Sequence, residues 1–160
     1  MSGRRPSLTL LVASQELLLA VRSRWTQIFT VVFAALSLAV ASSGYILSGG
    51  RGVQDFARTA ASLVQLVILL VPLASLLMGV LALAPDGGAT ELLYAQPVPR
   101  HTILMGKLLG LLQALTAAEA VGFGAAGLVI FSRSGGEGLG GFALLLLASV
   151  ALTAIFLGIA

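Results

Sequence analysis

The chain contains no cysteine, a single histidine and few charged residues. The absence of cysteine excludes a disulfide framework and a thiolate metal site, and His101 alone excludes a histidine-based metal site within one chain. Charged residues make up 9% of its 160 residues, whereas soluble domains carry roughly 25%. Since hydrophobic residues make up 58%, the composition predicts an integral membrane protein.

A nucleotide-binding loop is also missing. Gly106 and Lys107 are followed by a leucine, and no glycine stands five positions before Gly106, so the P-loop pattern is not formed. No residue pattern typical of catalysis is present either, and we expect this chain to have no enzyme activity, cofactor or metal of its own. The net charge of +3 comes with no basic cluster beyond two arginine pairs, which indicates membrane edges rather than nucleic acid.

Four continuous apolar stretches are long enough to cross a membrane. An α-helix rises about 1.5 Å per residue, so about 20 residues span a hydrocarbon core of ~30 Å. Continuous rather than alternating hydrophobicity favours helices over a β-barrel. We therefore expect an all-α, polytopic fold with transmembrane helices over residues 28–47, 60–84, 108–131 and 142–160.

Basic residues in the flanks of these stretches predict the orientation. Six lie in the N-terminal arm and the 85–107 loop, and three lie in the other two connections. The six are Arg4, Arg5, Arg22, Arg24, Arg100 and Lys107, and the three are Arg51, Arg58 and Arg133. Because cytoplasmic flanks are richer in Lys and Arg, we expect the N-terminus and the 85–107 loop in the cytoplasm.

Residues 7–25, before the first span, are predicted to form a helical arm. Small and polar residues recur on one stripe of this arm at helical spacing, and leucines lie opposite. The stripe consists of Thr9, Ala13, Glu16, Ala20 and Ser23. Two interpretations fit: a helix packed on other helices, or a helix lying in the cytoplasmic interface with Trp25 at the level of the lipid headgroups.

Glu119 stands at the midpoint of the third predicted span. An ionised group at this depth costs several kcal/mol unless it is paired or hydrated. Either the carboxyl is protonated and hydrogen-bonded to a neighbouring helix, or it lines a polar path. Glycines nearby, such as Gly122 and Gly124, allow close helix approach, so we expect Glu119 to face the helix bundle or a dimer seam rather than lipid.

The stretch "TELLYAQPVPR", residues 90–100, is polar and stiff between two apolar runs. It leaves room for a short helix over residues 90–96, which is marginal on its own. Pro97-Val98-Pro99 then forces an extended elbow, and Pro99 can stand in the first turn of the next helix. A plain interfacial loop would have a broadly similar sequence.

The fourth predicted span reaches the end of the given sequence at "TAIFLGIA". No polar or basic residue anchors its exit from the membrane. We expect the chain to be the front part of a longer protein, with about two further spans.

Two segments carry a family resemblance. "GGATELLYAQPVPRHTILMGKLLG", residues 87–110, resembles the cytoplasmic loop of ABC-2 type transporter permeases, with its Leu-Leu pair, its Gln-Pro-Val turn and its Leu-x-Gly-Lys entry into the next helix. "ASQELLLAVRSRW", residues 13–25, is similar to that family's opening. The resemblance covers the whole chain. Within the family, the chain most resembles the permeases linked to maturation of multicopper enzymes, including nitrous oxide reductase. The family's charged run before the loop helix is reduced here to Asp86.

This resemblance implies the first four of six spans of a permease subunit in the cytoplasmic (inner) membrane of a bacterium or archaeon. It implies a homodimer that works with separate ATP-binding subunits, which bind ATP and Mg²⁺, and with a periplasmic accessory protein. The loop helix would dock on the ATPase and act as a coupling helix. The expected docking residues are Glu91, Leu92, Tyr94, Gln96 and Pro97.

The implied function is to couple ATP hydrolysis in the partner to export of a substrate or to maturation of a periplasmic metalloenzyme. Two alternatives belong to other classes. The chain could be a membrane assembly scaffold that transports nothing, or a secondary transporter with Glu119 as its proton or ion carrier.

Overall fold

The computed structural model describes residues 8–46, 53–83, 99–134 and 139–160, and every regular element within these ranges is an α-helix. In chain order the helices are α1 (Leu8–Arg22), α2 (Arg24–Ile46), α3 (Val53–Leu83), α5 (Arg100–Ser134) and α6 (Leu139–Ile159). In α2, α3, α5 and α6 a stretch is long and apolar enough to cross a membrane. The predicted all-α, polytopic fold class is therefore confirmed.

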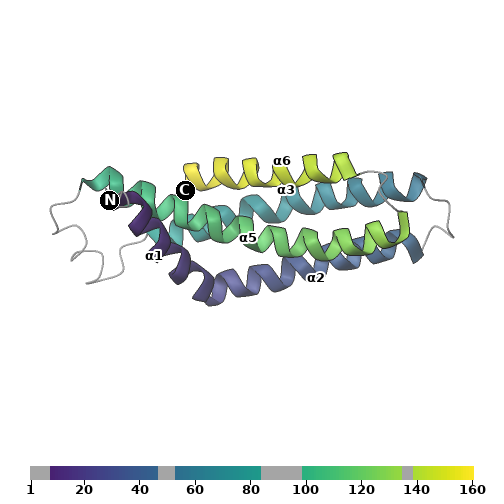
Figure 1. The fold of residues 1–160 in the computed structure, drawn as a ribbon, viewed down its shortest axis with the longest axis horizontal. Coiled ribbons are helices and arrows are strands. Elements are labelled where there is room, and N and C mark those ends of the chain that lie inside the picture. Colours follow the sequence, from purple (N-terminus) through teal and green to yellow (C-terminus); the bar gives the residue numbers. More distant parts are fainter. Residues whose placement is uncertain (1–7, 47–52, 84–98, 135–138) are drawn as a thin grey trace, which may run out of the picture.

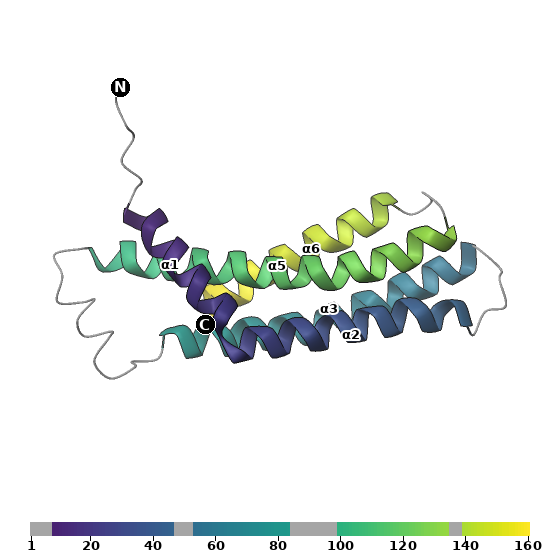
Figure 2. The ribbon, with the colours of Figure 1, turned by 60° about the horizontal axis from the view of Figure 1, so that its bottom comes forward.

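The four long helices lie side by side in an elongated bundle, and α1 crosses one end of it, as Figure 1 and Figure 2 show. α3 ends and α5 begins at that same end of the bundle. The N-terminal arm and the two ends of the 84–98 connection thus share one side of the protein, as the basic residues predicted. Which side faces the cytoplasm stays a prediction.

α5 is the central helix, and it contacts α1, α2, α3 and α6. Half of its most apolar window (50%) is buried, against 28% or less in the other three long helices. Glycines make this possible: Gly106, Gly110, Gly122 and Gly127 each bring a neighbouring side chain close to the α5 backbone. The other helices turn large aliphatic side chains outward, as helices surrounded by lipid do.

The helix ends differ from the predicted spans because a helix continues beyond its apolar window wherever nothing breaks it. α2 begins at Arg24 rather than at residue 28, and α5 begins at Arg100 rather than at residue 108. The arm is shorter than predicted, since α1 ends at Arg22 and Trp25 belongs to α2. Ser23 separates them, and its backbone N–H donates to the carbonyl of Ala20 at 3.0 Å, a tight turn that closes α1.

Phenylalanine side chains connect three of the long helices in the core. The rings of Phe33 on α2 and Phe123 on α5 pack edge to face with centroids 5.3 Å apart, and Phe123 packs on Phe142 of α6 at 5.8 Å. Such aromatic pairs add about 0.5–1.5 kcal/mol beyond their buried area. Gly122 is required beside them, because a Cβ atom at this position would overlap the Phe33 ring.

Ser37 on α2 is fully buried, and its hydroxyl has no hydrogen-bond partner among the described residues. A buried polar group without a partner costs about 1–3 kcal/mol. Ser37→Ala is therefore expected to raise the free energy of unfolding by up to about 1 kcal/mol, measured by thermal unfolding in detergent. Ser75→Ala is the matched control: the Ser75 hydroxyl donates to the carbonyl of Val71 at 2.7 Å, so its loss is expected to destabilise. Equal losses for both variants would contradict the prediction.

Candidate functional site

The predicted docking residues Glu91, Leu92, Tyr94, Gln96 and Pro97 lie outside the described residues, so their roles stay predictions. The structure describes both ends of the connection that carries them. α3 ends at Leu83, and the chain resumes at Pro99, whose carbonyl accepts the backbone N–H of Thr102 at 2.9 Å. Pro99 precedes the first helical residue of α5 rather than standing in its first turn. It is the N-cap residue, because its carbonyl accepts the first bond of the helix.

Lys107, about two turns into α5, links this helix to the last turn of α3. Its Nζ donates to the backbone carbonyl of Ala82 at 2.9 Å, across from α5 to the last turn of α3. Carbonyls in the last turn of a helix lack intrahelical partners, and a cation there is favoured by the helix dipole. The sequence suggested Lys107 only as a flanking charge and as part of a family motif. Its contact with Ala82 could not be found in the sequence, because the two residues meet only in the folded bundle.

α1 packs on the same turns of α5 through two glycines. A Cβ atom on Gly106 would lie 2.6 Å from the Val12 Cβ, and one on Gly110 would lie 2.6 Å from the Glu16 Cβ and 2.7 Å from the Ala13 carbonyl oxygen. Two glycines four residues apart form a flat groove that admits another helix closely. Only glycine at these two positions leaves room for α1.

The small and polar stripe of α1 is the face that meets α5. Ala13 and Ala20 are buried, while Leu10, Leu18 and Leu19 on the opposite side are between 57% and 65% exposed. Of the two interpretations of the arm, packing on another helix is observed. Its position relative to a lipid interface stays a prediction, with which the outward leucines are consistent.

Glu16 brings a carboxyl into this packed region. Burial against α5 raises the pKa of Glu16, and the nearby charge of Lys107 lowers it in part. Lys107 therefore interacts with two other helices: it donates a hydrogen bond to the end of α3, and its charge affects Glu16 on α1. We call Glu16, Lys107 and the Ala82 carbonyl the loop-base cluster.

Glu119 lies in the interior of the bundle, and its side chain is 1% exposed. The Ser149 hydroxyl oxygen is 2.8 Å from its Oε2, and the Thr153 hydroxyl donates to its Oε1. Both partners are on α6, so the carboxyl joins α5 to α6 and is turned away from the outer surface. No other polar group is hydrogen-bonded to Glu119 within the described ranges.

His101 is exposed near the start of α5. Within residues 8–46, 53–83, 99–134 and 139–160, no group of three or more His, Cys, Asp or Glu side chains could hold a metal ion. Within these residues there are two small polar clusters, the loop-base cluster and Glu119 with its two hydroxyl partners, and no metal centre.

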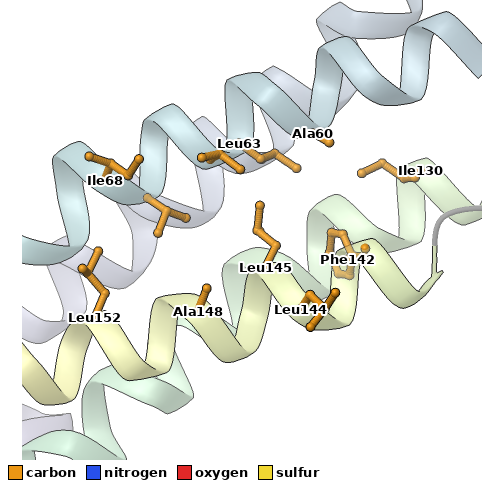
Figure 3. A pocket seen from close by; sticks show the side chains of 12 residues that line it. Ala60, Leu63, Ile68, Ile130, Phe142, Leu144, Leu145, Ala148 and Leu152 are labelled. Carbon is orange, nitrogen blue, oxygen red and sulfur yellow. The ribbon is translucent and has the colours of Figure 1, made fainter.

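An apolar groove of about 450 Å³ runs between α3 and α6 at the end of the bundle away from α1. Figure 3 shows Leu63 and Ile68 of α3 opposite Leu145 and Leu152 of α6, with Ile130 of α5 nearby. All the residues that line it are apolar. Such a lining suits hydrocarbon, and it offers no group that would recognise a charged or polar substrate.

These features define a multi-pass helical membrane protein in which a lysine of the central helix α5 caps the end of α3. The chain belongs to the ABC-2 family of transporter proteins, whose family model matches residues 10–160. The family resemblance seen in the sequence is therefore confirmed.

Two relatives are described as probable ABC transporter permease protein NosY. The protein from Pseudomonas aeruginosa is 36% identical over 123 residues, which are 76% of this chain and 45% of the relative. The protein from Stutzerimonas stutzeri is 36% identical over 121 residues, 74% of this chain and 44% of the relative. The matched part of the chain thus covers a little under half the length of these relatives.

Proposed function

We propose that this chain forms part of the transmembrane permease subunit of an ABC transporter, and that a separate subunit binds and hydrolyses ATP. The observation that carries the proposal is the family match over residues 10–160. The absence of a P-loop from these 160 residues is consistent with it, because ATP would then be bound outside this part of the protein. Membrane lipid surrounds the four long helices, and no cofactor is needed within this chain.

The loop-base cluster supports the proposed coupling. A force applied to residues 84–98 by an ATPase would reach α3 and α5 together, because Lys107 joins the end of α3 to α5 about two turns after α5 begins. α1 would follow, since it is packed on Gly106 and Gly110. The fold thus offers one stiff unit, made of α1, the end of α3 and the start of α5, on which the coupling helix over residues 90–96 would act.

The finer proposal is a homodimeric permease of the inner membrane, with its N-terminus in the cytoplasm, that serves maturation of a periplasmic metalloenzyme or export of a substrate. It rests on the sequence resemblance to that permease group and on the two NosY relatives. A periplasmic accessory protein is the further partner that this proposal includes.

Leu92→Asp tests the docking of the ATPase. A charge in place of a buried apolar anchor is expected to weaken the complex by about 2 kcal/mol, the size of a binding hot spot, or roughly 30-fold in Kd. The measurement is co-purification of the full-length permease with its ATP-binding subunit, followed by titration of that subunit. Membrane insertion is expected to stay unchanged.

Leu93→Asp is the matched control, because it places the same charge on a neighbouring residue outside the predicted docking set. It is expected to co-purify with the ATPase at normal yield. Normal yield for Leu92→Asp as well would place the docking surface elsewhere. If the unaltered protein binds no ATPase at all, the scaffold becomes the better hypothesis. Proton-coupled flux that is abolished by Glu119→Gln would instead favour the secondary transporter.

A further inference from the structure

α6 is attached to the bundle through very few buried side chains. Among its described residues only Ser149, Thr153 and Leu157 are buried. They are spaced four residues apart, so they form one narrow stripe along the helix. Two of the three are polar, and both of these contact Glu119 on α5. Half-buried apolar residues of α6, such as Phe142 and Leu152, also pack on the core, but the buried polar contacts of α6 with the other helices all go to one carboxyl.

No positive charge balances this carboxyl in the described part of the chain. α6 carries no charged residue at all. The charged or titratable residues with described side chains on the other helices stand on α1 or toward the ends of the long helices. They are Glu16 and Arg22 of α1, Arg24 of α2, Arg58 of α3, and His101 and Lys107 of α5. Lys107 is about 18 Å from Glu119 along the helix, at 1.5 Å per residue.

The Ser149 hydroxyl can be either the donor or the acceptor of the hydrogen bond with Glu119. It has one hydrogen and two acceptors within reach, the Glu119 Oε2 at 2.8 Å and the carbonyl of Leu146 at 2.9 Å. If Ser149 donates its hydrogen bond to the carbonyl of Leu146, its oxygen is free to accept a hydrogen bond from a protonated Glu119. The carboxyl then donates to Ser149 and accepts from Thr153, so that every polar group in the cluster is satisfied.

An ionised Glu119 would lack hydrogen-bond donors for most of its acceptor sites. A carboxylate has two oxygens with about four lone-pair sites, and only the two hydroxyls of α6 are available to it. Its side chain is 1% exposed, which leaves no room for a hydration shell. A buried charge without a cation or a full set of donors is strongly unfavourable in a low-dielectric interior.

We propose that Glu119 keeps its proton in the folded protein and donates a hydrogen bond through it to the Ser149 oxygen, so that Glu119, Ser149 and Thr153 form a neutral clasp between α5 and α6. The clasp leaves no net charge for a metal ion or a cationic substrate. It makes α5 and α6 move as one body when the permease changes conformation. This inference does not depend on ATPase docking, and it can hold or fail independently of the proposed function.

Infrared difference spectroscopy tests the protonation directly. The full-length protein and its Glu119→Gln variant would be compared in phosphatidylcholine vesicles near neutral pH. We expect the variant to lose one band in the protonated carboxyl C=O region, with no change in the carboxylate region. Loss of a carboxylate band instead would overturn the proposal.

Thermal unfolding tests the clasp. Glu119→Gln is expected to unfold within about a degree of the unaltered protein, because the amide N–H donates to Ser149 and the amide oxygen accepts from Thr153. Glu119→Ala is expected to unfold several degrees lower, since it loses both bonds to α6. Thr153→Val keeps the shape of the side chain and removes one hydrogen-bond donor, so its unfolding temperature is expected to lie between those of the other two variants. It replaces Glu119→Ala in the comparison if the alanine variant fails to accumulate. A Gln variant that unfolds as early as the Ala or Val variant would overturn the neutral clasp.

Discussion

Replacing Gly110 with leucine is expected to detach α1 from the bundle. A single Cβ atom at this position already lies 2.7 Å from the Ala13 carbonyl oxygen and 3.0 Å from the Leu17 nitrogen. These are backbone atoms, which cannot turn aside as a side chain can. Overpacking of a tight contact costs typically about 1–3 kcal/mol, and the upper end is expected here. That energy corresponds to roughly a 100-fold change in the docking equilibrium of α1.

Thiol labelling measures this release cleanly, because the chain has no cysteine of its own. Ala13 is 2% exposed, so a cysteine introduced by Ala13→Cys is expected to react slowly with a maleimide. The added Gly110→Leu substitution is expected to speed this reaction by at least about tenfold, which is 1.4 kcal/mol. Gly124→Leu is the matched control on the same helix, since nothing lies within 4 Å of a Cβ atom there. Equal labelling in all three backgrounds would show that α1 is not held by this groove.

The apolar runs of the sequence predicted the fold class, because the length of a membrane-crossing helix depends on the bilayer rather than on tertiary detail. They could not predict where each helix ends. Arg24 and Arg100 start helices well before the apolar windows, since polar residues at a membrane edge continue a helix as readily as they end it. The break at Ser23 depends on one local turn, for which the sequence offers no strong signal.

Single side chains were predictable where their chemistry restricts them. A mid-span carboxyl must find polar partners, and Glu119 does lie inside the bundle, although the sequence could not name Ser149 and Thr153 as its partners. The stripe of small residues on α1 similarly marked the face that packs. The contact of Lys107 with Ala82 was not predictable, because an exposed flanking lysine and a helix-capping lysine look identical in a sequence. Glu91 and its neighbours in the 84–98 connection remain predictions of the sequence alone.

Lys107→Met is expected to loosen the base of the loop without removing the packing volume of the side chain. The substitution abolishes the bond to the Ala82 carbonyl, and a hydrogen bond to a charged group contributes about 1.5–3 kcal/mol. It also removes the charge that lowers the pKa of Glu16, so that this pKa rises further above its ordinary value. Lys107→Arg keeps a donor and a charge, and it is expected to restore most of the lost stability.

The pH dependence separates the two effects of Lys107. Because the pKa of Glu16 is raised when α1 is docked, docking is favoured by protonation. Docking is expected to be tightest below the ordinary carboxyl range and to weaken as the pH rises through the raised value. Because a maleimide reacts with the thiolate, the labelling rate of Ala13→Cys is divided at each pH by the rate of the same cysteine in the Gly110→Leu background. This ratio should increase with pH, and Lys107→Met should extend the increase to higher pH. Glu16→Gln should make this ratio independent of pH, and a persistent dependence in that variant would assign it to another group.

The functional consequence of Lys107→Met follows from the proposed coupling. With the end of α3 no longer joined to α5 through Lys107, movement of an ATPase docked on residues 90–96 would be partly lost before it reaches both helices. The full-length complex is expected to assemble with unchanged affinity, while its permease-dependent stimulation of ATP hydrolysis falls several-fold. Phosphate release measures the stimulation, and titration of the ATPase subunit measures the affinity. If Lys107→Met lowers the affinity and leaves the stimulation per bound complex intact, Lys107 orders the docking surface instead of transmitting its movement.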